Sequence, residues 1–212
     1  SLKTLGVSAF SGCTSLKTVQ IPSGLETIGR QIFDNCPVLQ YNAYEGMNYL
    51  GNDDNPYVAL IGRADENQKV VNIHKDASVM MPTSLENLDI TSLKIPSKMT
   101  VPYNSLMKLP NLEHIEVEDG HPVYHTAGNC LIETATKKLV RGTANSVIPN
   151  DGSVTMIDYS AFAYLKDLTS IVIPEAITHI GGSSFAQCTN LKTLVLTTGL
   201  TRVDLSAFTG CT

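Results

Sequence analysis

The chain has 212 residues, of which 42% are hydrophobic and 17% are charged, fewer charged residues than the roughly 25% of an average globular protein. The formal net charge of −5 provides no basic field that would attract phosphate groups, so we expect no nucleic-acid partner. No apolar run is long enough to span a membrane. The opening residues, SLKTLG, lack the basic and apolar segments of a secretion signal, so an exported protein would need a targeting segment outside this sequence.

A repeat of about 23 residues runs through the sequence. It begins with an anchor pair, typically Phe followed three residues later by Cys, and continues into a main apolar strand such as LKTVQIP (16–22), LTSIVIP (168–174) or LKTLVLT (191–197). A smaller second strand follows, as in LETIG (25–29) and ITHIG (177–181). Seven anchor pairs occur, and they are Phe10 with Cys13, Phe33 with Cys36, Leu85 with Leu88, Leu106 with Leu109, Phe162 with Leu165, Phe185 with Cys188, and Phe208 with Cys211.

Two repeats are much longer than the others. They contain the segments NYLGNDDNPYVALIGR (48–63) and GNCLIETATKKLVRG (128–142), each of which has two apolar runs around a polar turn. This pattern indicates a β-hairpin. Each hairpin is followed by a further stretch with β character, VVNIHKDASV (70–79) and SVIPNDGSV (146–154). We therefore expect two expanded repeats, near residues 40–80 and 118–155.

These repeats predict the fold. One repeat of this length cannot bury its own apolar face, so successive repeats must stack. We expect a β-rich solenoid, a right-handed stack of repeats whose main strands form one parallel sheet, as a single domain over residues 1–212. Ile-Pro pairs such as 95–96 and 173–174 should end the main strands, because proline has no N–H for the sheet. Both ends of the sequence fall inside a repeat, as expected for a segment of a longer array.

The segments FSGCTSLKTVQIPSGLETIG (10–29) and SAFAYLKDLTSIVIPEAITHIGGSSFAQCTNL (160–191) resemble the BspA-like leucine-rich repeat family. The resemblance covers the whole chain, although residues 80–110 depart from the pattern by carrying Leu in place of Phe and Cys. It implies a bacterial protein, secreted or located at the cell surface, that adheres to host proteins, to matrix or to other cells.

The cysteines predict buried thiols rather than catalysis or disulfides. Four of the five occupy a repeat position that other repeats fill with Leu, as at Leu88, which marks an apolar site. Geometry alone leaves bridges between neighbouring repeats open, namely Cys13–Cys36 and Cys188–Cys211. The fifth, Cys130, follows His125 by five residues, but nothing in the sequence supplies a third group to orient such a nucleophile–base pair.

Two segments have the composition of metal sites without the required spacing. His121 and His125 lie near Glu116, Glu118 and Asp119, yet a zinc site needs further ligands that the fold holds in place. The run GNDDNP (51–56) lacks the regular spacing and distal Glu of a calcium loop, so we interpret it as a hairpin turn. No catalytic or phosphate-binding motif is present. We expect no enzyme activity, no cofactor and no metal.

The sequence predicts a monomeric binding module for a protein partner. In leucine-rich repeat strands the leucines point inward and the residues between them point outward, so the outward residues would contact the partner. Those of residues 106–118 are ionisable and could receive a basic or metal-bridged ligand. A spacer that presents another domain is the main alternative, and glycan binding through the hairpins is a lesser one. The outward candidates are Thr18, Gln20, His114, Glu116, Glu118, Ser170, Val172, Thr193, Val195 and Thr197.

Overall fold

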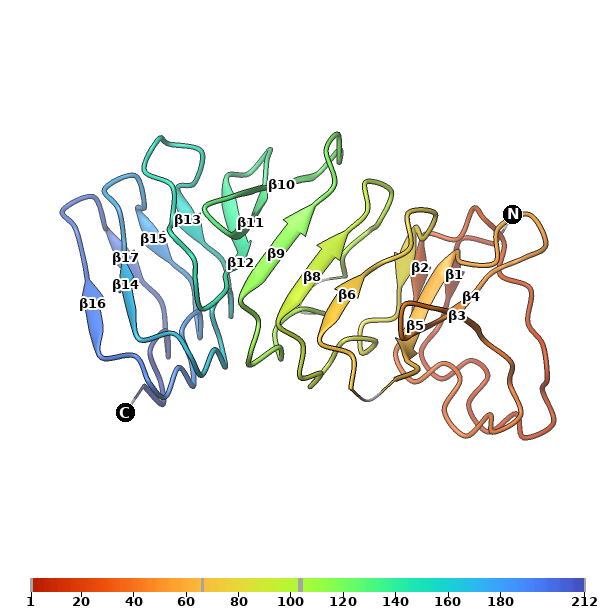
Figure 1. The fold of residues 1–212 in the computed structure, drawn as a ribbon. Helices are drawn as coiled ribbons and strands as arrows, with labels where there is room; N and C mark the ends of the chain where they lie inside the picture. Colours follow the sequence, from red (N-terminus) through yellow and green to blue (C-terminus); the bar gives the residue numbers. More distant parts are fainter. Residues whose placement is uncertain (1, 66, 103–104, 212) are drawn as a thin grey trace. The chain divides into compact units, whose positions relative to one another are not determined.

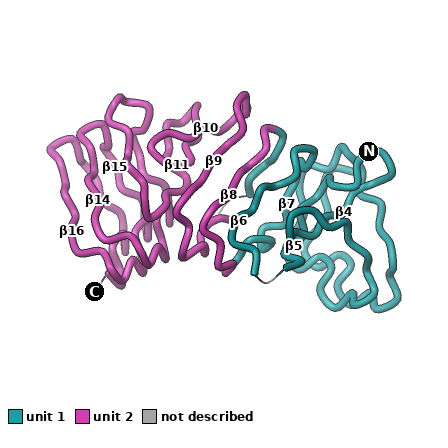
Figure 2. The backbone as a smooth tube through the Cα atoms, in the orientation of Figure 1, with its two compact units in different colours: residues 1–86, 98–105 teal, residues 87–97, 106–212 magenta. Residues whose placement is uncertain are grey.

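The computed structural model describes residues 2–65, 67–102 and 105–211, and it contains short β-strands joined by turns, with no helix in these residues (Figure 1). The predicted β-rich stack of repeats is confirmed. Strand pairs are offset by one repeat, as in Thr4 with Thr27 and His179 with Arg202, so each repeat forms one rung of a stack. The chain divides into two compact units (Figure 2), and the single domain expected over residues 1–212 stays a prediction.

Unit 1 comprises residues 1–86 and 98–105. Its strands are β1 (Thr4–Leu5), β2 (Thr27–Ile28), β3 (Asn42–Tyr44), β4 (Met47–Leu50), β5 (Ala59–Arg63), β6 (Val70–Asn72) and β7 (Val79–Met80). The second strands β1 and β2 pair in parallel. The strands β3, β4 and β5 form an antiparallel meander, which continues into β7 through a parallel pairing.

Unit 2 comprises residues 87–97 and 106–212. Its strands are β8 (Ser92–Ile95), β9 (His114–Val117), β10 (Tyr124–Ala127), β11 (Cys130–Glu133), β12 (Lys138–Arg141), β13 (Met156–Ile157), β14 (Ser170–Val172), β15 (His179–Ile180), β16 (Thr193–Val195) and β17 (Arg202–Val203). One sheet has the order β10-β11-β12-β13-β15-β17. Its first three strands are an antiparallel meander, and its remaining pairings are parallel. Separate parallel pairs join β8 to β9 and β14 to β16.

Both predicted hairpins are present, as β4–β5 and β11–β12. Each has one more strand than the sequence predicts, because β3 and β10 precede them and complete three-stranded meanders. The side chains of these extra strands are exposed or half-buried, so they lack the apolar alternation that predicts a strand. The segment 146–154, expected to have β character, contains no strand.

The single parallel sheet expected for the main strands is wrong. Residues 16–22 form no strand, and the described main strands of unit 2 are divided between two sheets, one in which β8 pairs with β9 and one in which β14 pairs with β16. The hairpin loops explain the interruptions. In unit 1, Ile21 N–H donates to the carbonyl of Gly51 (2.7 Å), and Asn52 Nδ2 donates to the carbonyl of Ile21 (2.6 Å). These bonds occupy backbone groups that a neighbouring strand would use.

In unit 2, the Gly128-Asn129 turn between β10 and β11 makes similar hydrogen bonds. Asn129 Oδ1 accepts the N–H of Ile115 in β9 (3.0 Å), and its Nδ2 donates to the carbonyl of Glu113. A Cβ at residue 128 would lie 1.8 Å from the carbonyl oxygen of Val147, so only glycine fits there. A Gly-Asn pair in each expanded repeat thus bonds the backbone of the preceding main segment in place of a neighbouring strand.

The anchor phenylalanines stack on one another as predicted. Phe185 is fully buried, and its ring lies 4.8 Å from that of Phe162 and 5.0 Å from that of Phe208, nearly parallel to both. In unit 1, the rings of Phe10 and Phe33 stack at 5.5 Å. Each anchor therefore receives its packing partners from neighbouring rungs, which is the contact that a stacked array requires.

The turns around the anchors are hydrogen-bonded between rungs. The N–H groups of Ser160, Phe162 and Tyr164 donate to carbonyls of the following rung, at 2.7 to 3.1 Å. Ser160 and Tyr164, which flank the anchor, both have left-handed backbones, with φ of 55° and 65°. Positive φ at two ordinary residues is sterically unfavourable, and here it orients three alternate N–H groups toward one neighbour. The turns therefore form a ladder of their own, without any helix.

The five cysteines are free. Those of the anchor pairs do more than fill apolar space, since Cys36, Cys188 and Cys211 each donate the thiol to the carbonyl of the Phe that anchors the preceding rung, at 3.1 Å. Burial raises the pKa of Cys188 to about 12 and that of Cys130 to about 11. These two thiols are therefore almost fully protonated at neutral pH and poor nucleophiles.

A buried arginine joins the two rungs between which the expanded repeat of unit 2 is inserted. Arg141 is 1% exposed, and its guanidinium donates to the carbonyls of Ala163 (3.1 Å), Ala161 (3.4 Å) and Leu109 (3.0 Å). Burial lowers its pKa to about 10, so it stays charged at neutral pH. The expanded repeat supplies no anchor pair between Leu109 and Phe162, and Arg141 donates to carbonyls on both sides of that gap.

We expect Phe185→Ala to lower the free energy of unfolding by about 3–5 kcal/mol, because it removes a ring packed on both faces. Phe208 is half-buried and stacks on Phe185 alone among the described residues, so Phe208→Ala should cost clearly less. Denaturant unfolding of the two variants measures the difference. Equal losses would contradict stacking between neighbouring rungs.

Replacing Arg141 with Met should destabilise unit 2 by about 1–3 kcal/mol, because the carbonyl of Ala163 loses its donor, whereas the carbonyls of Ala161 and Leu109 also accept backbone N–H groups. Lys138→Met, on the same strand but half-buried, is the control and should change the free energy of unfolding by less than about 0.5 kcal/mol. Urea titration followed by circular dichroism gives both values. An Arg141 variant as stable as the control would show that the carbonyl of Ala163 finds another donor.

Candidate binding face

In unit 1 the outward residues of the segment 16–22 border a polar hollow. Thr18 and Gln20 are exposed, and both line a hollow of about 360 Å³ beside the hairpin loop. Gln20 Nε2 donates to Asp53 Oδ1 at 3.1 Å, which ties this face to the loop. Tyr41 lines the same hollow, and burial is the main cause of its raised pKa.

Two of the three ionisable outward residues in and beside β9 form contacts within unit 2. His114 and Glu116 are exposed, whereas Ile115 and Val117 between them are buried, so the strand alternates as a half-buried strand should. Glu116 pairs with Lys94 of β8 at 2.9 Å. Glu118 Oε2 accepts the N–H of Ser97 at 2.9 Å. The two carboxylates therefore link neighbouring rungs and do not converge on a common ligand.

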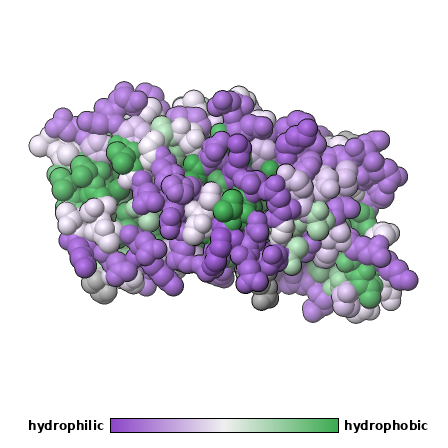
Figure 3. All heavy atoms as spheres, viewed as in Figure 1, coloured by the Kyte–Doolittle hydropathy of each residue, from purple (hydrophilic) through white to green (hydrophobic). Residues whose placement is uncertain are grey.

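The remaining outward candidates lie on a hydrophobic surface of unit 2. Val172 of β14 is 57% exposed and pairs in register with Val195 of β16, which is 43% exposed. Val147 occupies the same repeat position one rung earlier, before Ile148-Pro149, and is 74% exposed. We call these three residues the valine patch. Figure 3 shows hydrophobic side chains gathered over β14 and β16.

A hollow of about 450 Å³ opens at the valine patch. Val147 and Val172 line it together with the predicted residues Ser170 and Thr197, whereas Thr193, although exposed, does not. Glu175 is the one charged residue in this lining. Val147 was not among the sequence candidates because its segment was assigned to the hairpin unit, although its position before an Ile-Pro pair was a usable signal.

The histidines considered as metal ligands have other contacts. His121 Nδ1 accepts the N–H groups of Val123 and Tyr124 at 3.1 Å each, and His125 Nδ1 lies 2.8 Å from Thr134 Oγ1. Within the described ranges, no group of three or more His, Cys, Asp or Glu side chains could hold a metal ion. The run 51–56 is the predicted hairpin loop, closed by Asn52, whose Oδ1 accepts the N–H of Asp54 and of Asn55.

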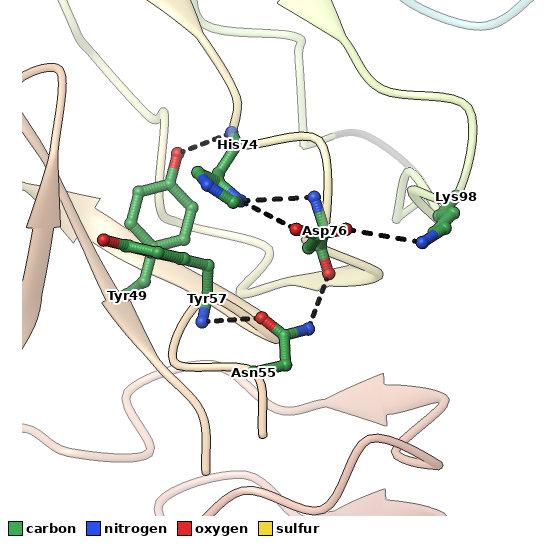
Figure 4. A network of polar contacts seen from close by, with 6 residues as sticks. All are labelled: Tyr49, Asn55, Tyr57, His74, Asp76 and Lys98. Atoms are coloured by element: carbon green, nitrogen blue, oxygen red, sulfur yellow. Dashed lines mark hydrogen bonds and ion pairs between the residues drawn. The ribbon is translucent and has the colours of Figure 1, made fainter. Parts of the chain in front are cut away.

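A cluster of aromatic rings in unit 1 was missed by the sequence interpretation. Tyr57 stacks on His74 with ring centroids 3.9 Å apart, and Tyr44 packs edge-on against His74 at 4.7 Å. His74 N–H donates to the hydroxyl of the buried Tyr49 (3.1 Å), and His74 Nδ1 accepts the N–H of Asp76 (3.2 Å) (Figure 4). These residues share no repeat position. The hairpin brings them together, so the repeat spacing could not predict their proximity.

Further hydrogen bonds and an ion pair surround this cluster. Asn55 Oδ1 accepts the N–H of Tyr57 (3.0 Å), and Asn55 Nδ2 donates to the carbonyl of Asp76 (2.9 Å) (Figure 4). Lys98 pairs with the Asp76 carboxylate at 3.4 Å. The network holds the loop 51–58 of the hairpin against the segment 74–76, so its role is to position the loop.

His179 of β15 interacts with a carboxylate of the following rung. Its Nε2 lies 2.8 Å from Asp204 Oδ2 on the next rung, and Arg202 Nε donates to Asp204 Oδ1 at 2.6 Å. The hydrogen bonds from His179 and Arg202 lower the pKa of Asp204. The residues lie 23 and 25 positions apart in sequence, at neighbouring positions on adjacent rungs, so the repeat spacing could have revealed the pair.

Comparison with known protein families matches residues 1–54 and 132–212 to six copies of the BspA type leucine rich repeat region. The matched segments make up more than half of the chain. The chain belongs to the BspA-type leucine-rich repeat family. Its one unmatched part, residues 55–131, runs from the loop between β4 and β5 to the start of β11. No curated protein sequence shows significant similarity to the chain.

Three solved structures show the same fold at low sequence identity. A leucine rich cell surface protein from Faecalibacterium prausnitzii shares 22% identity over 99% of this chain, with a TM-score of 0.61. A leucine-rich repeat protein from Eubacterium ventriosum shares 19% identity over 99% of the chain, with a TM-score of 0.54. The pneumococcal vaccine antigen PcpA shares 14% identity over 87%, with a TM-score of 0.53.

The BspA-type chain spans 62%, 61% and 51% of the lengths of these three proteins. Each match therefore describes part of a longer polypeptide. The similarity therefore shows that this chain has the fold of a leucine-rich repeat solenoid. It does not show that the chain has the activities of the longer proteins. No helix in the described residues is long and apolar enough to cross a bilayer.

We expect acid to destabilise unit 1 through His74. Burial lowers the pKa of His74, with Asp76 opposing and Lys75 adding to the shift. The unfolded state therefore binds the proton more readily, so this stabilisation is complete above the unfolded pKa of about 6.5 and is lost as the pH falls below it. Thermal unfolding at about pH 7.5 and pH 5 should show a smaller acid effect in His74→Asn than in the wild type.

His114→Asn is the matched control, because His114 is exposed on β9. The control should keep the acid sensitivity of the wild type. Identical pH dependence of all three proteins would exclude His74 as its source.

Proposed function

We propose that this BspA-type chain is a non-enzymatic binding module, displayed on a bacterial surface or secreted, and that the valine patch of unit 2 contacts a protein partner. The observation that carries the proposal is the exposure of Val147, Val172 and Val195 at one repeat position on successive rungs. Isolated exposed hydrophobic residues are ordinary on a protein, but here Val172 and Val195 are paired neighbours and Val147 lines the same hollow as Val172, and such grouping indicates an interaction surface.

Charge supports the same location. The third residue of β8 is Lys94 and that of β9 is Glu116. Both point outward, and they form an ion pair. At the valine patch the equivalent position is uncharged and β-branched. Depletion of charge at the centre of an interface, with charged residues at its edge, is the usual composition of protein–protein contacts. A uniformly polar face would favour a spacer, and the valine patch departs from that expectation.

Two further observations support a surface-displayed, non-enzymatic role. The solved structures that share the fold include a protein described as a cell surface protein and a vaccine antigen. The reactive groups of this chain have structural contacts, as in the thiol of Cys188 on a backbone carbonyl and the ring of His121 on two N–H groups.

A binding experiment with charged variants tests the proposal. The wild type, immobilised for interferometry, is exposed to a panel of purified matrix and serum proteins, and any partner is retested with Val172→Asp/Val195→Asp. Placing carboxylates in a desolvated patch should weaken binding by about tenfold or more. Val203→Asp, on the exposed valine of β17, should leave the affinity within about twofold.

The unfolding midpoints of the variants must match that of the wild type, since all three positions are exposed. Absence of any partner for the wild type, with cells and matrix also unbound, would favour the spacer. Partners that bind the double variant as tightly as the wild type would place the contact elsewhere on the chain.

A further inference from the structure

One edge of strand β14 has no strand partner in the part of the chain that the structure describes. On its other edge β14 pairs with β16, where Ile173 N–H donates to the carbonyl of Val195 (2.8 Å) and the carbonyl of Thr169 accepts from Thr193 N–H (3.2 Å). Successive backbone groups of a strand point to opposite sides. The N–H and C=O groups of Ser170 and Val172 therefore point away from β16.

The segment on the open side of β14 is held away from it by the hairpin. Val147 N–H donates to the carbonyl of Gly128 (2.8 Å), and Ser146 Oγ donates to the carbonyl of Asn129 (2.8 Å). Residues 146–150 consequently form no strand and make no ladder with β14. The hollow of about 450 Å³ described above is lined by both segments, so it opens onto the unpaired edge.

One residue of the lining has a hydroxyl without a partner. Thr197 Oγ1 is buried and has no hydrogen-bond partner among the described residues, although most buried polar atoms in folded proteins have one. The hollow thus combines aliphatic side chains with the open edge of β14, where the main-chain groups of Ser170 and Val172 point away from β16. An extended polypeptide has both properties in complementary form, because its backbone supplies N–H and C=O groups and its side chains alternate between two faces.

We propose that the hollow accepts an extended peptide segment of a partner protein, which adds to β14 as a further strand. This inference rests on the proposed function, since it gives the chemistry by which the valine patch would bind. The three residues of β14 span about 10 Å at roughly 3.3 Å per residue, so the added strand is short. Its main-chain groups bond Ser170 and Val172, and its outward side chains pack on Val147 and Val172.

Charge specifies one further feature of the peptide. Glu175 is exposed and follows β14 after Pro174, which has no N–H and so ends the edge. As the one charged group of the lining, Glu175 favours a Lys or Arg at that end of the added strand. The expected segment is therefore an alternating β-branched sequence of a few residues with an adjoining basic residue. A sugar would lack its usual stacking surface, because no aromatic ring lines the hollow.

The test selects linear peptides of about ten residues from a display library on the full chain and measures each selected peptide by fluorescence anisotropy. Alternating Val, Ile or Thr with one Lys or Arg should be enriched. Each synthetic peptide is then N-methylated at one backbone position at a time. Methyl groups on the N–H atoms that face β14 should weaken binding by about tenfold or more, and those on the intervening N–H atoms by less than about threefold.

Protein variants assign the peptide to this hollow. Val172→Asp should abolish binding and Glu175→Lys should select against basic peptides, whereas Val203→Asp should bind as the wild type does. The proposal is overturned if the library yields no peptide that depends on Val172, or if binding ignores N-methylation. It is also overturned if immobilised glycans, and not peptides, bind in a Val172-dependent way. Folded partner proteins that bind through the valine patch while linear peptides do not would retain the proposed function and eliminate strand addition.

Discussion

The structure depends on one constraint, which is that a rung of about 23 residues cannot satisfy its own backbone. Such a rung has no helix and no internal sheet, so its N–H and C=O groups must find partners on the adjacent rungs. The second strands do so by parallel pairing, as from Met156 to His179 to Arg202. The anchor turns do so through left-handed residues that orient alternate N–H groups toward the next rung. Even the thiol of Cys188 donates to a carbonyl of its neighbour. Apolar stacking of Phe162, Phe185 and Phe208 then stabilises a backbone arrangement that is already hydrogen-bonded.

The expanded repeats are the places where this constraint is met differently. Each inserts a three-stranded meander, and each uses a Gly-Asn pair to satisfy the strand or segment that the meander leaves unpaired. In unit 2 the missing anchor turn is replaced by Arg141, whose guanidinium serves three carbonyls from two rungs. Among the described residues, one edge of β14 has no strand partner, and Val147 and Val172 of the valine patch line the hollow at that edge. The proposed binding surface is therefore a by-product of inserting a hairpin into a stack.

Periodicity was sufficient to predict what repeats in register. The offset from Phe185 to Cys188 and Leu191 fixes which side chains stack, and the exchange of Cys with Leu at that position predicts burial. Periodicity could not predict which main strands pair, because Asn52 and Asn129 decide this through bonds to residues 31 and 16 positions away. The same limitation applies to the site. The outward positions of β14 and β16 follow from strand alternation, whereas Val147 and the aromatic cluster around His74 are placed by the hairpins. The role of Arg141 could not be predicted for a further reason. The sequence shows a charged residue in an apolar strand, but it does not show which carbonyls that residue binds.

The ladder formed by the anchor turns gives every rung two different faces. Ser183, Phe185 and Gln187 present donors toward the following rung, and the carbonyls of Gly182, Ser184 and Ala186 receive the donors of the preceding one. Any rung of this type can therefore follow any other, provided that their order along the chain keeps the same direction. A duplication or deletion of whole repeats leaves each interface matched, whereas a break within a repeat does not. Unequal recombination between repeated stretches of the gene would thus lengthen or shorten such proteins in steps of one rung, and most of the products would still fold.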